Sequence, residues 1–204
     1  MIFLSKSYSL FKSMGLLSFT RLALDLFFTK VFFPKARIIR RPYYIRNKGK
    51  FIFGKGFSTG PGLIIDILSK EAKLEIGDNF MAYHNLHIGT LEKVSIGDRV
   101  LVASGVYISD HSHGNYSDEI QSSPLEAPLE RTLFSSPIKI SDDVWLGERV
   151  TILPGVSIGK GTIVGAGALV TSNLPDYVIA IGIPAKVVKE FNFEKKKWMP
   201  IDGS

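Results

Sequence analysis

Four histidines are the side chains of this 204-residue chain best suited to acid–base chemistry. They form two close pairs, His84 with His87 and His111 with His113, and the chain contains no cysteine. An imidazole with an ordinary pKa of about 6.5 is largely neutral at physiological pH and accepts a proton from a hydroxyl group. Without cysteine, a thiolate nucleophile, a thiolate zinc site and a disulfide are excluded. Any catalysis must therefore use side chains other than cysteine.

A six-residue period surrounds the second histidine pair. An aliphatic residue recurs at every sixth position from Ile140 to Val170, and Ile96, Val102 and Ile108 keep the same phase ahead of the histidines. Such a period is typical of a parallel β-helix, in which each short strand and turn advances one face of a coil around a continuous core. In the long run the aliphatic positions and the small or β-branched residues four positions later are Ile140, Leu146, Ile152, Ile158, Val164 and Val170, with Val144, Val150, Val156, Thr162 and Ala168.

The period is lost over residues 113–137, which are rich in Ser, Pro and acidic residues. We expect a loop that is inserted into the regular coil directly after His111. Long loops without secondary structure of their own are uncommon in compact domains and are often functional. The position of this loop therefore also points to the second histidine pair.

The N-terminal region, residues 1–49, differs from the rest in charge and hydropathy. Residues 1–55 carry twelve Lys and Arg side chains against Asp25 alone, a balance of +11, so the remaining residues carry −5 of the total of +6. Nucleic-acid binding is not expected, because interleaved Gly-rich or aromatic recognition patterns are absent. The basic character instead suits an anionic membrane surface.

Apolar side chains crowd the first 34 residues, which we expect to form one or two helices that stop at Pro34. No stretch of about 18 uncharged apolar residues is present, so a membrane-spanning helix is not expected. An apolar core followed by a small-residue cleavage site is also missing, which argues against a signal peptide. The segment is expected to lie on a membrane or to pack on protein, and periodicity does not separate these two partners.

Residues 141–188, SDDVWLGERVTILPGVSIGKGTIVGAGALVTSNLPDYVIAIGIPAKVV, carry a resemblance to a known family. They resemble the hexapeptide-repeat acyltransferases, specifically sugar O-acetyltransferases of the galactoside, maltose and nodulation type. The resemblance covers about residues 50–190 and implies an all-β fold, a left-handed parallel β-helix, with a C-terminal tail over residues 191–204. It also implies acetyl-CoA as co-substrate, direct acetyl transfer and a homotrimer whose sites lie between adjacent prisms.

The same resemblance suggests roles for the histidines. In the segment VYISDHSHG, which begins at Val106, it implies that His111 is the general base, with His113 as the competing candidate. In MAYHNLHIG, which begins at Met81, Asn85 matches an amide that holds the acceptor or the carbonyl oxygen. His84 and His113 are expected near the acceptor, although His84 and His87 also fit as solvated surface side chains.

Coenzyme contacts are carried over in the same way. A tryptophan and small residues are expected along the thioester arm, and two lysines are expected at the coenzyme phosphates. Glu148 departs from the family, which often has a small residue there, and this puts that contact in doubt. The matching positions are Trp145, Gly147, Ala166, Thr171 and Ser172 for the arm, and Lys186 and Lys189 for the phosphates.

The N-terminal segment also bears on the acceptor. We expect acetylation of a sugar hydroxyl on a lipid-linked O-antigen or capsular polysaccharide intermediate, at the cytoplasmic face of the inner membrane. The alternatives are a small soluble acceptor, such as a free sugar, an antibiotic or serine, and a non-catalytic β-helix scaffold. A three-histidine zinc site, as in the carbonic anhydrases with this repeat, is disfavoured because the chain lacks their histidine spacing. No metal is expected.

Overall fold

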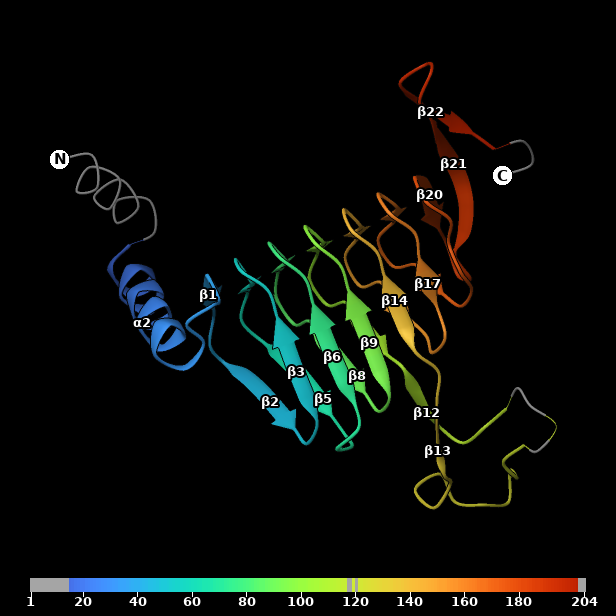
Figure 1. The fold of residues 1–204 in the computed structure, drawn as a ribbon, viewed down its shortest axis with the longest axis horizontal. Helices are drawn as coiled ribbons and strands as arrows, with labels where there is room; N and C mark the ends of the chain where they lie inside the picture. Colours follow the sequence, from blue (N-terminus) through green and yellow to red (C-terminus); the bar gives the residue numbers. More distant parts are fainter. Residues whose placement is uncertain (1–14, 117–118, 120, 202–204) are drawn as a thin grey trace.

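The structure is a computed structural model that describes residues 15–116, 119 and 121–201. Residues 1–14 of the predicted N-terminal segment, 117, 118 and 120 of the predicted loop, and 202–204 of the predicted tail lie outside the described residues. The chain winds into a three-sided coil of short parallel strands, with a helix at its N-terminal end and an antiparallel hairpin at its C-terminal end (Figure 1). The predicted parallel β-helix of hexapeptide repeats is confirmed.

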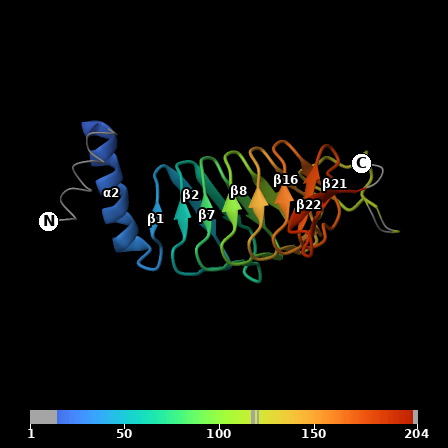
Figure 2. The same ribbon diagram turned by 90° about the horizontal axis from the view of Figure 1, so that it is seen from above.

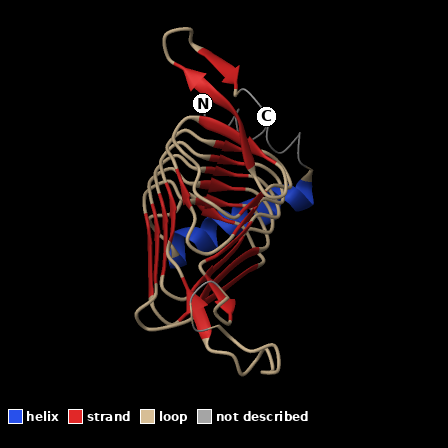
Figure 3. Ribbon diagram, turned by 90° about the vertical axis from the view of Figure 1, so that its right-hand side faces the viewer, coloured by secondary structure: helices blue, strands red, loops and turns tan. Residues whose placement is uncertain are grey.

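Three parallel sheets form the sides of the coil, and successive turns add one strand to each (Figure 3). Sheet A contains β1 Ile38–Ile39, β4 Ser58–Thr59, β7 Met81–Ala82, β10 Leu101–Val102, β15 Trp145–Leu146, β18 Ile163–Val164 and β20 Val178–Ile181. Sheet B contains β2 Tyr43–Asn47, β5 Leu63–Ile67, β8 His87–Thr90, β11 Tyr107–Ser109, β16 Thr151–Ile152 and β19 Leu169–Val170. Sheet C contains β3 Lys50–Phe53, β6 Lys73–Ile76, β9 Lys93–Ile96, β14 Ile138–Ile140 and β17 Ser157–Ile158. We call the turns between these sheets the AB, BC and CA corners.

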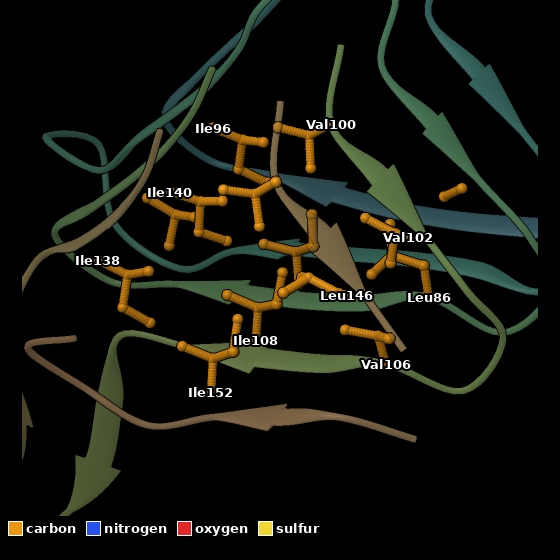
Figure 4. Packing of buried hydrophobic residues seen from close by; sticks show 14 of the residues in the cluster. Leu86, Ile96, Val100, Val102, Val106, Ile108, Ile138, Ile140, Leu146 and Ile152 are labelled. Carbon is orange, nitrogen blue, oxygen red and sulfur yellow. The ribbon is translucent and has the colours of Figure 1, made fainter. Parts of the chain in front are cut away.

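The core explains the six-residue period. Both repeat positions point inward, so Leu146 and Ile152 from the aliphatic position pack with Val106 from the position four residues later (Figure 4). Because the strands stack in register, each of these side chains lies above its equivalent in the previous turn, as Ile152 does above Ile108. Burial of one large aliphatic side chain is worth about 1.5–3 kcal/mol, and the stack repeats this along the whole coil.

The CA corners explain the recurring Ile-Gly-Asp sequence. The carboxylate of Asp98 accepts the backbone N–H of Asp78 at 2.7 Å, and Asp142 accepts that of Asp98 at 2.9 Å. A Cβ on Gly77 or on Gly97 would lie 2.7–2.8 Å from the backbone of the next turn. Glycine is therefore required by close approach of two corners, and aspartate satisfies a backbone donor between them.

Helix α2, Leu16–Phe32, lies at the N-terminal end of the coil (Figure 2). Within the described residues no helix is long and apolar enough to cross a membrane. Strands β1 and β2 already belong to sheets A and B, so the coil starts about ten residues before the predicted boundary at residue 50. Periodicity did not reveal these strands because the segment around them is dominated by arginine, proline and tyrosine.

Two antiparallel hairpins leave the coil on opposite sides (Figures 1 and 3). The predicted loop opens at the BC corner with β12, His111–His113, which pairs with β13, Leu133–Ser135. At the C-terminal end β21, Lys186–Asn192, pairs with β20 and with β22, Lys197–Pro200. Residues 191–200, which were assigned to a tail, therefore complete this hairpin.

Candidate functional site

His111 is held at the BC corner by two neighbours in the chain. Its Nδ1 lies 3.2 Å from Oδ1 of Asp110 and 3.3 Å from Oγ of Ser109. The side chain of His111 is only 15% exposed, whereas that of Asp110 is fully buried. An ionised carboxylate is an acceptor only, so Nδ1–H donates to Asp110 and Nε2 is left as the proton-accepting nitrogen. This is the arrangement that a general base requires.

Asp110 is itself fixed by the backbone of the preceding turn. Its carboxylate accepts the N–H groups of Leu91 at 2.7 Å, of Glu92 at 2.9 Å and of Lys93 at 2.8 Å. Three such bonds to one buried carboxylate orient it firmly. Through Asp110, the backbone of the preceding turn of the coil helps to position the His111 imidazole.

Gly89 provides the surface against which the imidazole rests. Gly89 stands beside Ser109 in the parallel register of β8 and β11, and its side-chain position faces outward. A Cβ at Gly89 would lie 3.0 Å from Cε1 of His111, so only hydrogen leaves room for the ring. His111 is thus packed against the outer face of sheet B at Gly89.

His113 belongs to the hairpin and not to this arrangement. Its Nδ1 lies 3.1 Å from the carbonyl oxygen of Pro128, and its own carbonyl oxygen accepts the hydroxyl of Tyr116 at 2.6 Å. Arg131 donates to the same tyrosine hydroxyl at 2.8 Å. These contacts tie His113 to the loop, where it is exposed.

Asn85 and His84 lie at an AB corner, before the start of β8, whereas His111 lies at a BC corner, beyond the end of β11. Asn85 has a φ of 56°, in the left-handed region, at the corner position that Gly62 and Gly105 occupy in neighbouring turns. Asparagine tolerates this conformation, which gives it a structural reason to be there. Strand β8 separates Asn85 from Gly89, a span of about 13 Å at the usual rise per strand residue. One chain therefore does not bring Asn85 and His111 together.

The residues expected along the coenzyme arm divide between the AB corners and a BC corner, at the two ends of the strands of sheet B. Trp145 is 48% exposed on sheet A, and Gly147 and Ala166 follow it at successive AB corners. Thr171 and Ser172 lie at the BC corner after β19, on the edge that also carries His111. Gly147 has a packing role as well, because a Cβ there would stand 2.6 Å from the backbone nitrogen of Ala166.

The two expected phosphate contacts lie beyond the coil. Lys186 and Lys189 are exposed on β21, opposite Ile181 and Ile179 of β20. One surface hollow, of about 700 Å³, runs along the outer face of sheet C, and none of the four histidines lines it. Among the described residues, no group of three or more His, Asp or Glu side chains is placed to hold a metal ion.

Reasoning from the sequence missed a second polar group near His111. On sheet B, Asp66 receives Nε of Arg46 at 2.9 Å and lies 3.3 Å from Nε2 of His87. The ring of His87 also packs edge-to-face on Tyr107, with centroids 5.1 Å apart. The sequence did contain a signal for Asp66 and His87. Each stands next to a buried aliphatic residue in its strand, β5 or β8, and side chains of a strand alternate between the two faces of the sheet.

The six-residue repeats that build this parallel β-helix define a hexapeptide-repeat transferase. Residues 137–172 match the family model "Bacterial transferase hexapeptide (six repeats)", and residues 94–110 match "Hexapeptide repeat of succinyl-transferase". The chain belongs to the hexapeptide-repeat O-acetyltransferases, as its similarity to full-length relatives shows.

Two relatives in this family are named as O-acetyltransferases. The chain is 43% identical over 188 residues to WbbJ of Escherichia coli K12, provisionally described as a lipopolysaccharide biosynthesis O-acetyl transferase, and the match covers 92% of this chain and 95% of that one. It is 37% identical to the galactoside O-acetyltransferase of the same organism over 64% of this chain and 60% of that one.

Two solved structures of acetyltransferases are similar to this chain in fold and in sequence. A galactoside acetyltransferase in complex with coenzyme A has a TM-score of 0.51 and 30% identity, over 78% of this chain and 68% of that one. A maltose O-acetyltransferase from Clostridium difficile 630 has a TM-score of 0.52 and 27% identity, over 74% and 71% of the two chains.

Proposed function

We propose that this protein transfers the acetyl group of acetyl-CoA to a sugar hydroxyl on a lipid-linked glycan, with His111 as the general base. The observation that carries the proposal is the buried Asp110, which holds Nδ1 of His111 and leaves Nε2 to receive a proton. The relatives support an acetyl donor and a sugar acceptor, since one is named for O-acetyl transfer in lipopolysaccharide biosynthesis and the other for O-acetylation of galactosides.

Direct transfer needs no acyl-enzyme. Nε2 of His111 takes the hydroxyl proton while the sugar oxygen attacks the thioester carbonyl carbon. The C–S bond then breaks, and the proton passes from the imidazole to the departing thiolate. Proximity of the two substrates supplies much of the acceleration, and a general base typically adds about 10²- to 10⁴-fold.

A trimer would complete the active site. Asn85 and His111 occupy opposite edges of sheet B, so Asn85 of one copy would meet His111 of its neighbour where two prisms pack side by side. In that cleft the amide of Asn85 or a backbone N–H meets the oxyanion, and Trp145, Gly147, Ala166, Thr171 and Ser172 line the arm, with Lys186 and Lys189 toward the phosphates. His84 and His113 would flank the acceptor.

The helix α2 supports a membrane position for this enzyme. Its polar residues Asp25 and Thr29 point inward and bind Arg41 and the backbone of Ile39. Its apolar residues face outward, and Leu17 and Phe27 are among the exposed ones. Exposed basic side chains in the last turn of α2 and directly after it complement anionic lipid headgroups. They are Lys30, Lys35 and Arg37.

The proposal is tested by thiol release from acetyl-CoA with purified full-length protein. Acceptors are methyl glycopyranosides and lipid-linked glycans extracted from bacterial membranes, and the variants are His111→Ala and His113→Ala. We expect His111→Ala to lower kcat at least a hundredfold and His113→Ala to lower it much less. Equal losses in both variants would reject His111 as the base. Absence of coenzyme turnover with every acceptor would favour a scaffold.

A further inference from the structure

We infer that the acceptor sugar binds on the outer face of sheet B, on the N-terminal side of His111, with Asp66 and Tyr107 as its principal contacts. The inference rests on the proposed function and deepens it. It adds to the acceptor surface a carboxylate and an aromatic ring that the family resemblance did not suggest.

The register of sheet B places Asp66 next to the base. Asp66 pairs with Gly89, and the imidazole of His111 lies over Gly89. Adjacent strands of a sheet are about 4.8 Å apart, so the carboxylate stands one strand from the imidazole on the same outer face. A sugar that bonds to Asp66 through one hydroxyl can therefore present a neighbouring hydroxyl to His111.

Asp66 is a prepared acceptor for hydrogen bonds. Arg46 donates to Oδ1 at 2.9 Å, His87 approaches Oδ2 at 3.3 Å, and the carboxylate side chain is still 16% exposed. A carboxylate offers about four lone-pair sites, so two remain for ligand hydroxyls. Arg46 and His87 also hold the side chain in one orientation, which reduces the entropy lost when a sugar binds.

Tyr107 provides the apolar part of the surface. It is 38% exposed and stands beside His87 in the register of β8 and β11, with the two rings at 77° to each other. His87 lies between Tyr107 and Asp66 and contacts both, so one outward surface carries an aromatic ring and a carboxylate. A pyranose has hydroxyls at the edge of its ring and C–H groups on its faces, so this surface favours a sugar over a purely apolar or a purely ionic acceptor.

The donor and acceptor sides are then separated along the coil. The coenzyme candidates, from Trp145 to Ser172, all come from turns that follow His111, whereas Asp66 and His87 come from turns that precede it. The N-terminal side also carries α2, at the end of the coil (Figures 1 and 2). A glycan attached to a lipid beside α2 would reach His111 across the face of Asp66.

The test measures acceptor and coenzyme KM separately in the full-length protein. The variants are Asp66→Asn and Tyr107→Ala. The matched control is Glu75→Gln, because Glu75 is another outward carboxylate of the same turn, on sheet C, with an ion pair to Lys93 at 3.2 Å. We expect the acceptor KM of Asp66→Asn to rise about ten- to a hundredfold, as for loss of a hydrogen bond to a charged group. The acetyl-CoA KM and the Glu75→Gln kinetics should stay within about twofold of wild type.

An acceptor KM that is unchanged in both Asp66→Asn and Tyr107→Ala would overturn the inference and leave the proposed function intact. Parallel rises in the KM of acceptor and coenzyme, with a lowered melting temperature, would also overturn it, because they indicate damage to the fold. If wild type binds coenzyme A in calorimetry but acetylates none of the sugars, the proposed function fails first and the inference falls with it. If His111→Ala keeps the wild-type kcat, His111 is not the base, but the acceptor KM of Asp66→Asn still tests whether the sugar binds at Asp66.

Discussion

The imidazole of His111 lies over the backbone of Gly89, and a methyl group on that glycine would stand 3.0 Å from Cε1 of the ring. We predict that Gly89→Ala moves the imidazole by a few tenths of an ångström and lowers kcat about tenfold or more, because catalysis depends steeply on the position of the base. Gly114, at the start of the loop, differs from Gly89 in this respect, because a Cβ on Gly114 would meet Tyr116 and Ser122 and not His111. A Gly89→Ala enzyme with wild-type kcat would show that the ring is not confined there.

Asp110 should act as a positioning residue for His111. In Asp110→Asn the charged acceptor for Nδ1 is lost, and we predict a fall in kcat of about tenfold or more with an unchanged KM for acetyl-CoA. The control is Asp98→Asn, since Asp98 makes a similar bond to a backbone N–H at a CA corner, far from His111. Asp110→Asn should melt at lower temperature, by an amount that corresponds to about 1–3 kcal/mol, and Asp98→Asn should lose less because its side chain is 45% exposed. A loss of kcat in the control as large as in Asp110→Asn would assign Asp110 a structural role only.

A site shared between copies predicts complementation. We expect His111→Ala and Asn85→Gly to be weakly active alone and to regain activity when their subunits are mixed, because each intact site needs His111 from one copy and Asn85 from the next. Glycine at position 85 keeps the φ of 56° accessible. Random mixing in a cyclic trimer should restore about a quarter of the sites. Analytical ultracentrifugation checks the trimer, and mixed subunits without regained activity would place the two residues in separate roles.

The apolar face of α2 should bind membranes. We predict that the double variant Leu17→Ser and Phe27→Ser reduces co-sedimentation with vesicles containing anionic phosphatidylglycerol at least tenfold, since each side chain contributes about 1.5–3 kcal/mol when buried. Ile183→Ser is the matched control, because Ile183 is 75% exposed at the other end of the coil. A double variant that keeps vesicle binding but loses its oligomeric state would identify the face as a subunit contact.

The ion pair between Arg99 and Asp143 predicts a pH effect on stability. Arg99 donates two hydrogen bonds, at 2.6 Å and 3.0 Å, and these hold the pKa of the Asp143 carboxyl below its ordinary value of 3.8. The folded state therefore binds this proton more weakly than the unfolded state, so the contribution to stability is present above pH 3.8 and is lost as pH falls through the lower folded pKa.

Asp143→Asn should accordingly melt slightly below wild type at pH 7, with the difference closing at strongly acidic pH. The effect is expected to be small, because both side chains are well exposed to solvent. Asparagine also tolerates the φ of 60° at this position. A difference in melting temperature that is independent of pH would show that the pair is not its source.

The sequence by itself determined the coil and its core. Ile140, Leu146 and Ile152 recur every sixth residue because one side of the coil is two strand residues and a turn, and burial of their side chains selects that winding over all others. The same periodicity located the inserted loop, and the family resemblance that it carries pointed to His111.

The tertiary structure decided how the polar residues meet. Asp66, Gly89 and His111 are far apart in the chain and become neighbours only through the register of parallel strands, which depends on the length of every intervening turn. For the same reason Asn85 and His111, which are separated by a similar length of chain, lie beyond opposite ends of the strands of sheet B. The side chains that point inward follow the six-residue repeat, so the sequence shows them directly. Contacts between outward side chains of different turns depend on the register of the strands, which only the winding of the whole coil sets.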